Sequence, residues 1–253
     1  MKRALDLFSG TGSWKKVMKK THHVISVDIT DYKGKFIPTH KVDILTWDYK
    51  IYPKDHFDMI SAGCPCIWYS ILQRSWLGRY KRDKVTKEKY LYTQERYEQD
   101  LEYSDRLVLK TLEIIKYFSP RLWFIENPAT SLLKTRPFMK DLPYYDVDYC
   151  SYGFLYKKST RIWTNKKDFK PKRCAKDNCP SIIQYKNKRH HLIDCSYSTT
   201  KPPPRVMEAL KSKNKHMLTT GSWGNGIQKG VGSGNNRLDR YRVPQPLIED
   251  LVG

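Results

Sequence analysis

Two side chains of this sequence have the types and setting needed for covalent chemistry, the thiol of Cys66 and the carboxyl group of Glu126. Each follows an apolar, β-prone run: residues 57–61 precede the Pro65-Cys66 segment, and residues 121–125 precede Glu126. Open α/β sheets bind their ligands at the carboxyl ends of such strands. The pattern predicts a nucleophilic cysteine with a carboxyl partner on one rim of a sheet. The alternatives are a buried structural thiol and a glutamate that caps a turn.

A glycine-rich turn lies upstream, where a nucleotide-like ligand would be bound. Residues 4–8 form a predicted strand, residues 9–14 a tight turn with two glycines, and a helix is predicted from Lys15. This is the first unit of a doubly wound sheet. Glycines let the backbone approach a ligand, and a helix N-terminus favours electronegative groups. Because many tight turns share this pattern, it gains weight only together with other features.

Two aspartates extend this predicted site. Asp28 ends the predicted strand 24–27, the position at which such folds bind ribose hydroxyl groups. Asp43 lies in the next predicted strand, 42–45, where its carboxylate could accept from an adenine amino group. A turn aspartate and a capping aspartate are the respective alternatives.

The remaining pattern completes a doubly wound, Rossmann-like α/β fold. An amphipathic helix is predicted over 97–118, ended by Ser119-Pro120, and further strands over 144–148 and 160–164. A turn and a short amphipathic helix are predicted over 241–252. We expect one catalytic domain formed by 1–165 and 237–253, with a small loop-rich region at 166–236.

The charge of the chain points to a polyanionic partner. The 253 residues carry a formal net charge of +21, and residues 166–215 hold 14 Lys and Arg against 4 Asp and Glu. Residues 73–96 hold 8 against 3, which indicates either a basic loop beside Cys66 that contacts phosphates or a solvated charged helix. The sequence has no apolar run near the ~20 residues of a membrane span. With six cysteines and no expected signal peptide, we predict an intracellular protein without membrane association.

Cysteines and histidines of the basic region could hold a metal ion. The zinc candidates are Cys174, Cys179, His190 or His191, and Cys195. Their spacing is wider than the tight pairs of most Cys/His zinc sites. We therefore assign no metal at this stage, and free thiols in a region that faces nucleic acid are the alternative.

Taken in order, the motifs resemble those of DNA (cytosine-5)-methyltransferases, in the short form found in phages and large DNA viruses. The resemblance spans almost the whole chain, and the set is more specific than any single motif. The residues that carry it are Asp6-Leu7-Phe8-Ser9-Gly10-Thr11-Gly12, Asp28, Asp43-Ile44, Pro65-Cys66 with Ser70, Glu126-Asn127-Pro128, the region of Arg161 and the terminal Arg242-Val243-Pro244.

The resemblance implies a methyltransferase fold with S-adenosylmethionine as methyl donor and double-stranded DNA as partner. It implies that Cys66 attacks C6 of a flipped cytosine, that Glu126 assists at N3, and that Arg161 helps the thiolate to form. The implied cofactor-binding residues are Phe8, Ser9, Gly10, Thr11, Gly12, Trp14, Asp28, Ile29, Asp43, Ile44 and Pro65. We expect a monomer, in the cytoplasm or, if the chain is viral, in the host cytoplasm or nucleus.

The sequence departs from the family pattern in three places, of which the first is Ile67, where the family usually has Gln after Pro-Cys. The family usually has Gln-x-Arg-x-Arg after a Tyr-Gly pair. Here we align Arg161 with the last arginine, so that Ser159, or else Lys158, replaces the first. The family's Gly-Asn-Ala-Val-Pro segment reads Arg-Tyr-Arg-Val-Pro at 240–244. Two other functions therefore stay open: the same chemistry on RNA, as in a branch that methylates transfer RNA, and an inactive fold that only binds DNA.

Overall fold

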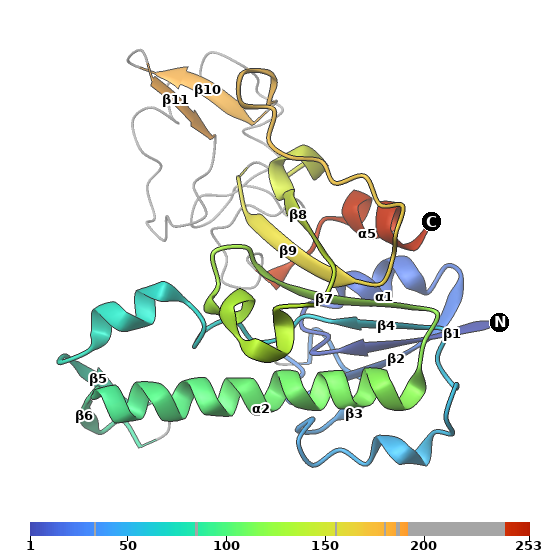
Figure 1. Cartoon of the computed structure of the whole chain (residues 1–253), viewed down its shortest axis with the longest axis horizontal. Coiled ribbons are helices and arrows are strands. Elements are labelled where there is room, and N and C mark those ends of the chain that lie inside the picture. The colour runs from blue at the N-terminus through green and yellow to red at the C-terminus, as the bar shows by residue number, and fades with distance from the viewer. Residues whose placement is uncertain (33, 84–85, 155, 180, 186–187, 192–240) are drawn as a thin grey trace.

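The computed structural model describes the chain except residues 33, 84–85, 155, 180, 186–187 and 192–240 (Figure 1). Its centre is a seven-stranded sheet in the order β3-β2-β1-β4-β7-β9-β8. All neighbouring pairs from β3 to β7 are parallel, and β9 runs antiparallel to both β7 and β8. The strands of this sheet are β1 (Lys2–Leu7), β2 (His22–Asp28), β3 (His40–Lys41), β4 (Met59–Ala62), β7 (Leu122–Pro128), β8 (Tyr144–Asp148) and β9 (Ser159–Thr164).

Helices cover both faces of the sheet, as the doubly wound α/β prediction requires. Helices α1 (Ser13–Met18) and α5 (Gln245–Val252) pack on one face, and α2 (Gln94–Phe118) packs on the other (Figure 1). Successive strand residues alternate between the two cores: Phe124 belongs to the α1/α5 side and Ile125 to the α2 side. The predicted fold class is confirmed.

Helix α2 shows how the sequence sets an element's limits. The Thr93 hydroxyl accepts a hydrogen bond from the amide of Arg96 and caps the first turn. The helix ends where Ser119 adopts a left-handed conformation, with φ of 44°, directly before Pro120. The amphipathic helix predicted over 97–118 is confirmed and begins three residues earlier.

Two predicted segments differ from the structure. The strand predicted over 42–45 is instead a turn after the short strand β3, in which the Asp43 carboxylate accepts from the amide of Leu45. The basic segment 73–96 is a short 3₁₀ helix, η2 (Ile71–Trp76), followed by the hairpin of β5 (Tyr80–Arg82) and β6 (Lys89–Leu91). Asx-type hydrogen bonding by Asp43 competes with a strand, which explains the first difference.

The described part of the basic region runs back along the antiparallel end of the sheet. It contains η6 (Lys176–Asn178) and a hairpin of β10 (Ile182–Tyr185) and β11 (Lys188–His191). The other short helices are η1 (Tyr49–Ile51), η3 (Leu132–Thr135), η4 (Pro137–Met139) and η5 (Tyr149–Tyr152). Among the helices that the structure describes, none is long and apolar enough to cross a membrane.

Candidate active site

A pocket opens at the carboxyl ends of the parallel strands. The space between its walls measures about 530 Å³, part of it open to solvent. Six predicted cofactor residues line it, namely Phe8, Asp28, Ile29, Asp43, Ile44 and Pro65. The lining also includes residues that the sequence reasoning missed, namely Val27, Val42, Trp68, Tyr103 and Leu107.

The missed residues come from two places with different signals. Tyr103 and Leu107 are one helical turn apart on α2, so the i, i+4 spacing of that helix could have pointed to a shared face. Trp68 follows Cys66 by two residues and had no separate signal. The aromatic rings and aliphatic side chains give the pocket apolar walls, and its two carboxylates give it acceptors.

The glycine turn positions Asp28 for this pocket. Gly10 and Gly12 have φ of 51° and 67°, a left-handed conformation that favours glycine. The Gly10 amide donates to one Asp28 oxygen at 2.8 Å, and the Thr30 amide donates to the other at 2.9 Å. Burial raises the pKa of Asp28, and these amide hydrogen bonds lower it in part. The carboxylate therefore has a fixed orientation at the wall of the pocket.

Five other predicted residues do not line the pocket: Gly10 and Gly12 of the turn, together with Ser9, Thr11 and Trp14. The Ser9 amide donates to the carbonyl of Val27 at 3.1 Å, and the Thr11 hydroxyl contacts the Ser13 hydroxyl at 3.2 Å. Trp14 lies in the core, stacked on Phe124 with ring centroids 5.3 Å apart. The structure thus separates the residues that face the pocket from those that hold the turn.

The Pro65-Cys66 segment leaves β4 beside the same pocket. Asn127, fully buried on β7, donates from its side-chain amide to the carbonyl of Cys64 at 2.9 Å. Cys64 is itself buried in the α2-side core, as expected for a packing residue, whereas Cys66 is only half-buried. Pro65 lines the pocket, and Cys66 is the next residue of the chain.

Glu126 and a lysine act on the Cys66 thiol. The Lys158 ammonium group lies 3.2 Å from Glu126 Oε1, and the Tyr149 hydroxyl donates to the same oxygen at 3.0 Å. Burial raises the pKa of Cys66, while the Lys158 cation lowers it and the Glu126 carboxylate raises it. The structure therefore brings Cys66, Glu126 and Lys158 into one electrostatic cluster.

Arg161, the arginine predicted from the sequence, lies elsewhere. Its guanidinium group forms two hydrogen bonds with Asp146, at 2.8 and 2.9 Å, and stacks over the Tyr144 ring. Glu126 pairs with Ile162 across β7 and β9, so Arg161 projects from the opposite face of the sheet. The basic residue on the Glu126 side is Lys158, three positions earlier, because strand side chains alternate with a period of two.

The zinc candidates are only partly described. Cys174 and Cys179 lie close together, and Cys150, which the sequence reasoning did not include, lies with them. The backbone of His190 and His191 belongs to β11, and Cys195 lies outside the described residues.

Comparison with known proteins supports the motif pattern. The chain is similar to a protein of Frog virus 3 (isolate Goorha) named "Probable DNA (cytosine-5)-methyltransferase". The two are 31% identical over an alignment of 256 residues that covers 99% of this chain and 98% of that protein. A crystal structure described as a DNA modification methyltransferase encoded within an E. coli prophage aligns with a TM-score of 0.46 at 15% identity, over 68% of this chain and 51% of that one. No protein-family profile matches the chain.

Proposed function

The chain belongs to the DNA (cytosine-5)-methyltransferase family, and from this premise we propose that it methylates C5 of cytosine in double-stranded DNA with Cys66 as its nucleophile. One observation supports this proposal: Cys66 directly follows Pro65 of the pocket wall, and both members of the Glu126–Lys158 ion pair act on the pKa of its thiol. A nucleophile next to both a pocket wall and a charged pair is the arrangement that covalent methyl transfer requires.

We propose that the pocket binds S-adenosylmethionine, the usual donor of methyltransferases. The lining of the pocket fits a nucleoside. Its apolar and aromatic walls suit an adenine ring, and the Asp28 and Asp43 carboxylates can accept hydrogen bonds from ribose hydroxyl and adenine amino groups. Bound there, the cofactor supplies an electrophilic methyl group. Asp28, held by the amides of Gly10 and Thr30, orients the ribose.

In the proposed reaction, the Cys66 thiolate adds to C6 of the cytosine and makes C5 an enamine-like nucleophile. Negative charge moves toward N3 during this addition, and Glu126 offsets it by sharing a proton there. After C5 accepts the methyl group, a water molecule takes the C5 proton, the electrons of that C–H bond form the C5–C6 double bond, and the bond from sulfur to C6 breaks to release the thiolate. The aromatic ring is then restored.

Lys158 takes the place that Arg161 had in the sequence-based expectation. Its cation favours the thiolate of Cys66, and its contact with Glu126 Oε1 orients that carboxyl group. Because Tyr149 also donates to Oε1, we assign the other oxygen, Oε2, to N3 of the base. Lys158 thus links the nucleophile to the proton-sharing group.

The cytosine must leave the duplex to reach Cys66, because C6 is inaccessible in stacked DNA. The net charge of +21 favours the phosphate backbone. We propose that residues 166–236 form the recognition region, that 1–165 with 237–253 form the catalytic domain, and that the protein acts as a monomer.

The test is methyl transfer from tritiated S-adenosylmethionine to double-stranded DNA of mixed sequence, with transfer RNA as the rival substrate. We expect labelled DNA and a covalent adduct with DNA that contains 5-fluorocytosine. Cys66→Ser should lower the rate by at least about 10³-fold and form no adduct. The control, Cys64→Ala, changes a buried thiol of the same segment and should keep the adduct. Label on RNA alone, or full activity of Cys66→Ser, contradicts the proposal.

A further inference from the structure

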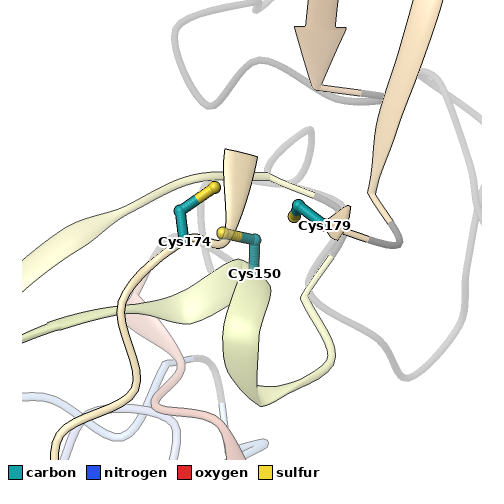
Figure 2. A group of neighbouring side chains, drawn as sticks. All are labelled: Cys150, Cys174 and Cys179. Carbon is teal, nitrogen blue, oxygen red and sulfur yellow. The ribbon is translucent and has the colours of Figure 1, made fainter. Parts of the chain in front are cut away.

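Three cysteines gather at the antiparallel end of the sheet, and none of them has a role in the proposed methyl transfer. The sulfur atoms of Cys150, Cys174 and Cys179 all lie within 4.8 Å of one another (Figure 2). Cys150 and Cys179 are buried, with 1% and 5% of their surface exposed, and Cys174 is partly exposed. Thiolates around a tetrahedral Zn²⁺, at bond lengths of about 2.3 Å, are about 3.8 Å apart, which these positions reach with small rotations.

The backbone holds this cluster in place from two separate segments. Cys150 lies in η5, directly after β8. Asp148, two residues earlier, accepts hydrogen bonds from the Cys174 amide at 2.9 Å and from the Arg173 side chain at 3.0 Å. Asp148 therefore fixes the Cys174 segment against the end of β8.

A tight turn then returns the chain to the cluster. The Cys179 amide donates to the carbonyl of Lys176, which closes η6 between Cys174 and Cys179. The sulfur of Cys179 also contacts the hydroxyl of Ser181 at 3.1 Å, and Ser181 is 1% exposed. A buried hydroxyl beside a sulfur is the kind of outer contact that orients metal-binding thiolates.

We propose that Cys150, Cys174 and Cys179 bind one structural Zn²⁺ through their thiolates, and that this ion ties the segment leading into β10 and β11 to the end of β8. Soft thiolate ligands select zinc over magnesium or calcium, which prefer oxygen. The three thiols release their protons when the ion binds, and no oxidant or reductant is needed. A disulfide would use only two of the three sulfurs, and none of the described cysteines forms one.

A fourth ligand completes the usual tetrahedron. The backbone pairing of β10 and β11 places His191 opposite Ile182, three residues after Cys179. His191→Ala is therefore the first variant that tests for the fourth ligand.

The experiment measures bound metal in the full chain, purified under reducing conditions without chelators. We expect about one zinc per chain by mass spectrometry of the element, and a thiolate-to-cobalt charge-transfer band after replacement with Co²⁺. Cys150→Ser, Cys174→Ser and Cys179→Ser should each lose most of the zinc. The matched control is Cys64→Ser, a buried thiol on the opposite side of the sheet, which should keep it.

Because a cysteine variant could lose zinc through misfolding, the effect of the metal is also measured on the wild-type protein. Chelation should lower its melting temperature, and Zn²⁺ but not Mg²⁺ should restore it. Zinc-free wild-type protein that binds neither Zn²⁺ nor Co²⁺, unchanged zinc in Cys150→Ser, or a mapped disulfide among these cysteines overturns the proposal. Because metal content is read without a methyl-transfer assay, this result is independent of the proposed function.

Discussion

In the parallel half of the sheet, from β3 to β4, functional groups follow the strands, whereas in the antiparallel half one of them precedes its strand. Asp28 is the last residue of β2, and Cys66 follows the end of β4, so both come at the carboxyl end of a parallel strand. Lys158 comes just before β9, and it reaches the same rim because β9 runs the opposite way and pairs Thr160 with Pro128. Side chains from strands of both directions can thus lie at one rim. Only in the parallel half does the sequence show them as a motif that follows a predicted strand.

The two halves also stabilise their carboxylates differently. In the parallel half, Asp28 is held by backbone amides, without a described salt bridge. Glu126, on the neighbouring strand β7, pairs with Lys158 of the segment before β9, and in the antiparallel half Asp146 pairs with Arg161. The cation near Cys66, the proposed nucleophile, therefore comes from the segment that leads into β9, and we expect larger rate effects from basic residues there.

The strongest test of this comparison contrasts Lys158→Gln with Arg161→Gln. Removing the Lys158 cation takes a charge-assisted hydrogen bond from Glu126 and a favourable field from the thiolate, so we expect kcat to fall about 10- to 100-fold. Arg161→Gln removes a contact on the opposite sheet face and should lower kcat less than about 10-fold. Steady-state methyl transfer measures both, and a reversed order would break the assignment of Lys158.

A second test uses the reactivity of Cys66 with iodoacetamide as a function of pH, read at Cys66 by peptide mass mapping. Burial raises the pKa of this thiol, so alkylation should keep rising above the usual thiol range. Lys158→Gln should move the rise to higher pH, and Glu126→Gln should move it to lower pH. Shifts of the same sign in both variants would contradict the cluster.

The same contrast explains what the sequence could and could not predict. The strand-turn-helix unit and Pro65-Cys66 are local patterns, and they led correctly to the fold and to most of the pocket wall. Arg161 and Lys158 differ by an odd number of residues, so the sheet face depends on a register that no local pattern sets. Cys150 lies beside Cys174 because the antiparallel strand β9, within the 23 residues between them, returns the chain to the end of β8.

In the parallel half, Asp28→Asn should raise the KM for S-adenosylmethionine about 5- to 10-fold with a smaller change in kcat. The amide group of asparagine would face the Gly10 or Thr30 amide, which is itself a donor, so the side chain would lose one bond and its orientation. Asp31→Asn, close in sequence and ion-paired with Lys41 at the surface, is the control and should leave KM unchanged. An equal effect of both variants would remove Asp28 from the proposed ribose site.

The smallest effect on catalysis, and a distinct effect on stability, is expected at Asp6 in the same half. Burial raises the pKa of Asp6 to about 7, and the hydrogen bond that Ser61 donates offsets this only in part. The folded state thus holds a proton that the unfolded chain releases near pH 4, so the contribution of Asp6 to stability is lost as the pH rises from about 4 to about 7. Asp6→Asn stays neutral and can still accept from Ser61. It should raise the melting temperature at pH 8 by about 2–8 °C and change it little near pH 4. A gain of equal size at both pH values would show that Asp6 has the same pKa in the folded and the unfolded chain, which contradicts the raised pKa.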